Sequence, residues 1–139
     1  MDKRIKIGVS SCLLGNNVRY NGGNARNRYI TDTLSEYLEF FPVCPEVECG
    51  LGIPRLTMHL RGDVKSPRLI TTKTGEDHTE VMVTWAKKRL EELADKDLCG
   101  FIFKKKSPSS GMYRVKVFND KGQPVNKGSG IFAGMFMKR

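Results

Sequence analysis

The sequence predicts an α/β fold with a short, mostly parallel sheet flanked by helices. Short apolar segments that suit buried strands alternate with longer segments whose apolar residues recur every three or four positions, as on one face of a helix. This alternation is typical of parallel strands joined by right-handed crossovers. The length of 139 residues, with 39% hydrophobic and 28% charged side chains, predicts one globular domain, residues 1–139, that needs no disulfide to fold.

The first third of the chain predicts strand, loop, helix and strand. Residues 6–11 form an apolar run that ends in a loop rich in glycine and asparagine. One helical face is predicted next from the spacing of five apolar residues, Ile30, Leu34, Tyr37, Leu38 and Phe41. Residues 40–44 predict a second strand, which Pro45 stops.

The rest of the chain predicts four more strands and two helices. A second helix follows a capping box at Thr74 and Asp77 and runs to about Lys96. The closing segment suits a short helix. The expected strands are residues 56–60, 68–71, 99–103 and 114–118.

The net charge of +9 is unevenly spread along the chain. Residues 1–50 carry six basic and six acidic side chains, which leaves 18 basic and 9 acidic for the remainder. Such a surface attracts polyanions such as RNA, or small anionic ligands. The chain lacks the interleaved aromatics and glycines of RNA-binding motifs, so RNA is a possible partner but an ordinary solvated surface is favoured.

The expected compartment is the cytosol. The apolar run near the N-terminus is too short to span a bilayer or to serve as a signal peptide, so no membrane partner is expected. In a reducing compartment, cysteines more often stay free, bind metal or do chemistry than form disulfides.

Three of the four cysteines lie where strands are predicted to end: Cys12, Cys44 and Cys49. Ligands of parallel sheets bind beyond the carboxyl ends of the strands. Three thiolates are one short of a closed zinc site, whereas a three-cysteine iron-sulfur cluster keeps one open iron that acts as a Lewis acid toward sulfur. The alternative is that the cysteines are small buried residues, which is favoured for Cys99.

Other candidate site residues lie in the same strand-end segments. Glu46 follows Cys44 closely, and a carboxylate beside a metal centre can serve as a general base. Ser107, Ser109 and Ser110 offer hydroxyl and N–H groups that suit binding of an anion or of a heterocycle's carbonyl, and Arg19 is a further ligand contact. Solvated loops and ion pairs are the alternatives. The chain has neither the nucleophile elbow of a serine hydrolase nor a nucleotide-binding glycine motif.

Several motifs together resemble a known family. They are SSCLLG, VRYNGG, PVCPE, TGED and KSPSSG, in this order over nearly the whole chain. The chain is similar to the domain of unknown function 523 family, whose best-understood members are thiouracil desulfurases.

The resemblance implies a Rossmann-like α/β domain that binds an oxygen-sensitive 4Fe-4S cluster through three cysteines. The open iron would take sulfur from a small thiolated nucleobase and leave the oxo form, without net redox chemistry. Cys12 and Cys44 match cluster ligands, and Glu46 and Ser107 match residues that handle protons and position the substrate.

The third ligand departs from the family pattern. The desulfurases usually read SPSCG in the last motif, and Ser110 stands where that cysteine would be. We hypothesise that Cys49 replaces it, since one cysteine is lost and one gained in motifs that are predicted to adjoin. The sequence thus predicts a desulfurase that uses Cys12, Cys44 and Cys49. The alternative is a non-catalytic metal- or RNA-binding module that uses the basic surface.

Overall fold

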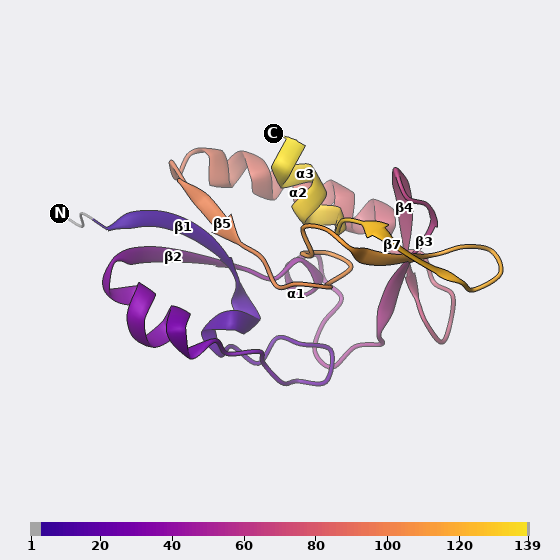
Figure 1. Ribbon diagram of the computed structural model, residues 1–139, viewed down its shortest axis with the longest axis horizontal. Coiled ribbons are helices and arrows are strands. Elements are labelled where there is room, and N and C mark those ends of the chain that lie inside the picture. The colour runs from indigo at the N-terminus through magenta and orange to yellow at the C-terminus, as the bar shows by residue number, and fades with distance from the viewer. Residues whose placement is uncertain (1–3, 139) are drawn as a thin grey trace.

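A computed structural model describes residues 4–138 and shows two sheets side by side (Figure 1). The first sheet contains β1 (Ile5–Ser10), β2 (Leu38–Val43) and β5 (Gly100–Ile102) in the order β2-β1-β5, with both neighbours parallel to β1. This is the predicted parallel sheet. Because the strands are parallel, their carboxyl ends share one edge.

The second sheet is mostly antiparallel and was not predicted as a separate layer. Its order is β4-β3-β6-β7, from β3 (Met58–Asp63), β4 (Ser66–Thr71), β6 (Val115–Phe118) and β7 (Pro124–Gly128). Two hairpins, β3-β4 and β6-β7, join through a parallel pair between β3 and β6. Strand β7 has an exposed, polar sequence, so hydrophobic alternation could not reveal it.

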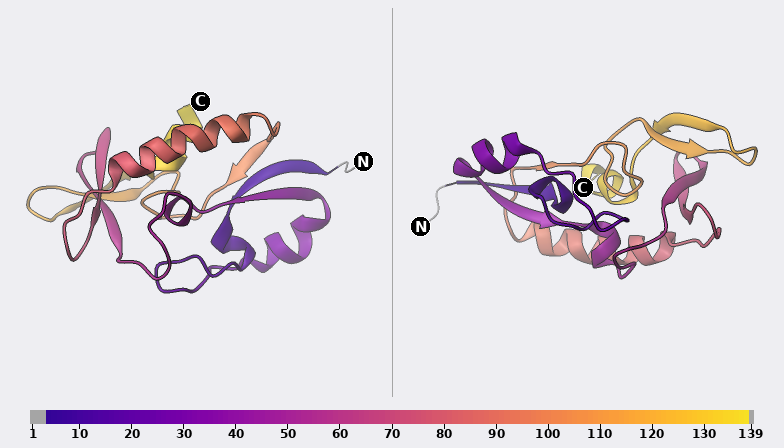
Figure 2. Two further views of the ribbon diagram at one scale, coloured as in Figure 1. Left: turned by 180° about the vertical axis from the view of Figure 1, so that it is seen from behind. Right: turned by 90° about the horizontal axis from the view of Figure 1, so that it is seen from below.

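Helix α2 (Thr79–Ala94) runs along both sheets (Figure 2). Its C-terminal half shares a core with the first sheet and with α3 (Ile131–Lys138): Val43, Ala86, Leu90, Leu93 and Phe132. Its N-terminal half contributes to a second core: Leu60, Leu69, Met82, Val115 and Val117. The side chain of Trp85 packs against both clusters, so α2 ties the two sheets together.

The first two of the three predicted helices differ in outcome. Helix α2 begins at Thr79, later than the capping-box pattern indicates, and the carboxylate of Asp77 accepts the N–H of Thr79 at 2.9 Å. The predicted helix through Leu38 and Phe41 is wrong beyond residue 36. A π-helical turn, η2 (Tyr29–Thr33), and a 3-10 turn, η3 (Leu34–Glu36), precede β2. Leu38 to Val43 pair with β1 instead, and this long-range pairing overrides the local helical spacing.

Within residues 4–138, every helix is too short or too polar to span a membrane.

The N-terminus of α3 holds the serine loop, which we define as residues 107–111. The free N–H groups of its first turn donate to this loop, Ile131 to the Pro108 carbonyl and Ala133 to the Ser109 carbonyl, both at 3.0 Å. The N–H of Gly130 donates to the Gly111 carbonyl at 2.7 Å. These three bonds make α3 the support of the loop.

Gly130→Ala is expected to displace the serine loop. A Cβ at this position would overlap backbone atoms of Ser109 and Ser110. Backbone atoms cannot move aside as the end of a flexible side chain can, so the loop itself has to shift. The expected cost is about 1–3 kcal/mol of unfolding free energy, measured by denaturant titration. Gly134→Ala is the matched control on α3, because its Cβ would meet only the Ser129 hydroxyl at 3.3 Å. Equal stability of the two variants would contradict the prediction.

Candidate functional site

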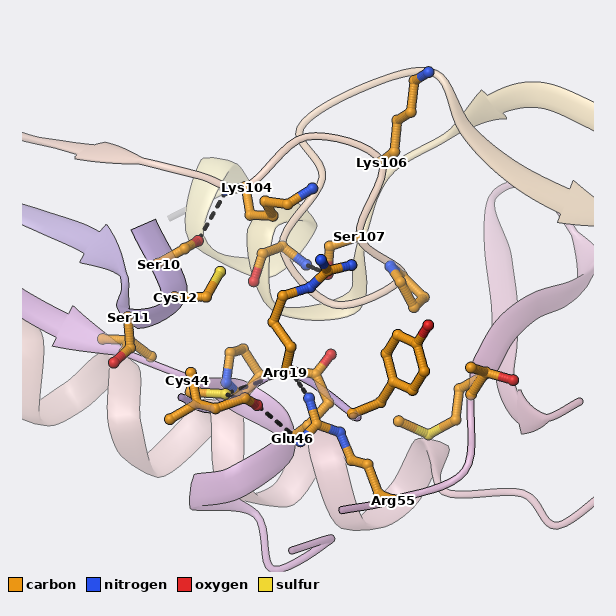
Figure 3. A pocket seen from close by; sticks show the side chains of 18 of the residues that line it. Ser10, Ser11, Cys12, Arg19, Cys44, Glu46, Arg55, Lys104, Lys106 and Ser107 are labelled. Carbon is orange, nitrogen blue, oxygen red and sulfur yellow. Dashed lines mark hydrogen bonds and ion pairs between the residues drawn. The ribbon is translucent and has the colours of Figure 1, made fainter. Parts of the chain in front are cut away.

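Three segments meet beyond the shared edge of the first sheet, as predicted. Cys12 lies in a 3-10 turn, η1 (Ser11–Leu14), directly after β1, and Cys44 directly follows β2. Lys104 follows β5, and its N–H donates to the Ser10 hydroxyl at 2.9 Å, which joins the ends of β1 and β5. Figure 3 shows Cys12, Cys44 and Lys104 around one cavity.

The cavity has a volume of about 310 Å³ and a positive lining. This size suits a small molecule. Among its lining residues, one is acidic, Glu46, and five are basic: Arg19, Arg55, Lys104, Lys105 and Lys106. The site therefore favours a ligand that is anionic or rich in hydrogen-bond acceptors.

Both cavity cysteines are held as neutral thiols. Burial raises the pKa of Cys12, although the charges of Lys104 and Arg19 oppose this shift. Burial, the Glu46 carboxylate and, to a smaller extent, Cys12 together raise the pKa of Cys44 to about 11. A metal that binds here must therefore displace protons from the two thiols.

In the metal-free protein, the cysteines are expected to differ in their rates of alkylation. Exposed Cys99 should react first. Cys44 should react slowly at pH 8, because a thiol with a pKa of about 11 is ionised there only to about one part in a thousand. Its rate should rise about tenfold per pH unit toward pH 11, as measured by iodoacetamide labelling and peptide mass spectrometry. A Cys44 rate that does not depend on pH would contradict the assigned environment.

Glu46 links a cavity thiol to the serine loop. It lies on α1 (Pro45–Glu48), one helical turn that begins directly after Cys44, and it is only 8% exposed. One carboxylate oxygen accepts a very short hydrogen bond from the Ser109 hydroxyl. The other lies 3.8 Å from the Cys44 sulfur and 3.9 Å from a guanidinium nitrogen of Arg55. The carboxylate is thus within reach of a proton at the thiol side of the cavity.

A second carboxylate positions Cys44 from outside the cavity. Glu48 accepts the N–H of Cys44 at 2.8 Å, and its other oxygen forms an ion pair with Arg89 of α2 at 3.0 Å. Burial raises the pKa of Glu48, and Arg89 opposes this shift. Sequence reasoning missed the role of Arg89, because no local pattern relates a residue on α2 to a cysteine 45 positions earlier.

Comparisons with known proteins identify the family of this chain. The sequence matches the family described as 2-thiouracil desulfurase over residues 7–139. The chain belongs to the 2-thiouracil desulfurase family. Uncharacterized protein YbbK of Bacillus subtilis (strain 168) is 32% identical over 132 residues, which cover 91% of this chain and 86% of that protein.

A solved structure of similar fold supports the family assignment. The 4Fe-4S-dependent thiouracil desulfidase TudS matches with a TM-score of 0.73 and 27% identity, over 97% of this chain and 86% of that chain. The predicted α/β class and the resemblance to this desulfurase family are therefore confirmed. The two sheets show how loosely the term Rossmann-like fits, because only the first is a parallel sheet of that kind.

Most of the predicted site residues of this desulfurase family member line one cavity. They are Cys12, Cys44, Glu46, Ser107, Ser110 and Arg19. Ser109, predicted as a substrate contact, is fully buried and lies outside the lining. The packing of α3 against the serine loop turns its hydroxyl inward to Glu46, so Ser109 acts as a support and does not contact a ligand in the cavity.

Cys49, the hypothesised third ligand, lies apart from this cavity. It ends α1 and packs against the core cluster that includes Leu60 and Met82, with its thiol 3.5 Å from the Glu46 carbonyl. It does not line the cavity. Burial and the Glu46 carboxylate raise its pKa to about 11, but neither Cys12 nor Cys44 contributes to the shift. Cys44 therefore lines the cavity, whereas Cys49, five residues later, packs toward the second core.

Proposed function

We propose that this protein removes sulfur from the thiocarbonyl of a small thiolated nucleobase and leaves the oxo form. The observation that carries the proposal is one small cavity in which two thiols, a carboxylate and a serine loop converge, in a chain of the 2-thiouracil desulfurase family. The reaction exchanges sulfur for a water oxygen and releases hydrogen sulfide, so atoms balance and no electrons are transferred.

An iron-sulfur cluster is the proposed cofactor, since the structural relative TudS is described as 4Fe-4S-dependent. Cys12 and Cys44 are soft thiol donors that suit iron. A set of three thiolates does not fit the cavity, because within residues 4–138 no three His, Cys, Asp or Glu side chains gather closely enough to hold a metal ion. A bound cluster would supply an open iron that acts as a Lewis acid toward sulfur.

The protein's own residues have three roles in this proposal. Arg19 and Lys104 draw an acceptor-rich base into the cavity by their positive charge. Ser107 lines the same cavity, where its loop orients the base. Glu46 takes a proton from the attacking water and returns one to the departing sulfur, because it is buried beside Cys44.

The test is a desulfuration assay on protein reconstituted with iron and sulfide without oxygen. With 2-thiouracil or 4-thiouracil, the expected result is release of sulfide in step with loss of the thiocarbonyl absorbance, and formation of uracil by chromatography. A fully loaded protein that releases no sulfide from either base would overturn the proposal. A colourless protein with stoichiometric zinc would favour the non-catalytic metal-binding alternative instead.

A further inference from the structure

Arg55 lines the cavity, yet its guanidinium is engaged by the protein itself. Its side chain is only 10% exposed, whereas most arginines lie at the surface. One terminal nitrogen donates to the Val18 carbonyl at 2.9 Å and to the Gly52 carbonyl at 3.1 Å. The other lies 3.9 Å from a carboxylate oxygen of Glu46. Burial of a guanidinium costs solvation, so a position of this kind indicates a role beyond that of a surface ion pair.

Arg55 binds the chain on both sides of Arg19, in a segment that we call the Arg19 turn (residues 18–23). Its side chain donates to the Val18 carbonyl, and its backbone N–H donates to the Tyr20 carbonyl at 2.9 Å. Between these two points, Arg19 lines the cavity with its guanidinium 5.8 Å from the centre of the Tyr20 ring. Figure 3 shows the side chains of Arg19 and Arg55 together at the cavity. Arg55 is therefore placed to set the direction in which Arg19 enters the cavity.

The Arg19 turn depends on these contacts, because its other hydrogen bonds are local. Two backbone hydrogen bonds, at 2.9 Å and 3.1 Å, join Arg19 to glycines of the same turn and do not tie it to either sheet. In the part of the chain that the structure describes, the other hydrogen bond from this turn to a distant segment is a long one, from the Cys44 thiol to the Val18 carbonyl at 3.8 Å. A thiol that has lost its proton to bind a metal cannot donate this bond. In the loaded protein, Arg55 is then the main support of the turn.

We propose that Arg55 is a positioning residue of the desulfuration site, which directs Arg19 toward the bound base and holds the Glu46 carboxylate at the cavity. This inference rests on the proposed function. Arg55 acts through these two residues and does not bind the base itself, because its terminal nitrogens already face two carbonyls and a carboxylate. The planar guanidinium reaches all three acceptors at once, which the single ammonium group of a lysine cannot do.

Two substitutions separate the contacts of Arg55. Arg55→Lys keeps a positive charge near Glu46 but loses the bonds to two carbonyls at once. With Arg19 less well directed, this variant should raise KM about tenfold and keep kcat within about threefold of wild type. Arg55→Met removes the charge as well, at a similar side-chain length. It should also lower kcat about 100-fold, because the proton carrier Glu46 is then misplaced.

A double-mutant cycle shows whether Arg55 acts through Arg19. Wild type, Arg55→Lys, Arg19→Met and the double variant are loaded with iron and sulfide without oxygen, and KM for 2-thiouracil is measured for each. If Arg55 works by directing Arg19, the double variant should match Arg19→Met in KM within about twofold, because no guanidinium is left to misdirect. Increases in KM that multiply in the double variant would show that Arg55 binds the base independently, which would overturn the inference.

Hydrogen exchange of the metal-free protein gives a second readout that is independent of activity. The amides of residues 16–24 should exchange about tenfold faster in Arg55→Lys than in wild type, because the turn loses an attachment, whereas the amides of α2 should keep their wild-type rates. Arg61→Met is the matched control, since Arg61 is an exposed arginine of β3 outside the cavity lining. It should change neither the exchange of residues 16–24 nor KM. Wild-type exchange of this segment in Arg55→Lys would overturn the inference.

Other outcomes separate this inference from the proposed function. If loaded wild-type protein releases no sulfide, the proposed function fails, and the part of Arg55 in the reaction fails with it. If wild-type protein is active and Arg55→Lys has a normal KM, the inference alone fails. If Arg55→Met does not fold, the comparison of Arg55→Lys with wild type decides, because that variant keeps the charge beside Glu46.

Discussion

Replacing Cys12 or Cys44 by alanine is expected to abolish iron uptake and desulfuration together. These two cysteines are the thiols that line the cavity at the strand ends. Loss of a direct thiolate ligand should lower iron affinity by more than the roughly 10- to 100-fold that changes in surrounding hydrogen bonds cost. Iron and sulfide analysis after anaerobic reconstitution measures the loss, and sulfide release measures activity.

Cys99→Ala is the matched control, because Cys99 is exposed and does not line the cavity. It should keep the full iron content and the wild-type rate. Both cavity variants should still fold, since each change removes one sulfur from a position that is only partly buried. Retention of the cluster in Cys12→Ala or Cys44→Ala would show that the strand-end cavity is not the cofactor site.

Glu46→Gln is expected to lower kcat by about 10²- to 10⁴-fold, the usual contribution of a positioned proton carrier, while the cluster stays bound. The amide oxygen of glutamine can still accept the Ser109 hydroxyl, so the link to the serine loop survives. Proton transfer is lost because an amide does not titrate. Single-turnover sulfide release and iron content together separate the two effects.

The same substitution has a second consequence in the metal-free protein. The Glu46 carboxylate helps to raise the pKa of Cys44 to about 11, so its removal should lower that pKa and speed alkylation of Cys44 near pH 9. Glu48→Gln is the matched control, since Glu48 lies on the same helical turn but outside the cavity. It should keep a near-normal kcat once loaded. If Glu46→Gln desulfurises at the wild-type rate, Glu46 is not the proton carrier.

Local signals in the chain were sufficient to predict where the site lies. An apolar run that stops at a proline or enters a polar loop indicates the end of a strand. Cys12, Cys44 and Lys104 each lie at such a strand end. The parallel arrangement then followed from the alternation of strands with helices, and it brought these positions together. The long helix α2 was also predictable, because its apolar spacing continues over 16 residues.

The partners of the site residues were not predictable in the same way. Cys49 follows Cys44 by five positions, yet the turn of α1 directs it to the core beside Leu60. Ser109 and Ser110 are neighbours in sequence, but α3 holds their loop so that the first hydroxyl bonds Glu46 and the second lines the cavity. The residues 38–43 carry helical spacing but form β2, because pairing with β1 is available only in the folded chain.

The sequence by itself determined the family, the parallel sheet and the strand-end segments that carry the chemistry, because these depend on short-range patterns and on motif order. Only the tertiary structure decided which donors face one another. That choice depends on the rotation of α1 against α2, through Glu48 and Arg89, and on the hydrogen bonds from α3 to the serine loop. These contacts join residues far apart in the chain, and as a result the cavity holds two thiols instead of the three that motif reading predicted.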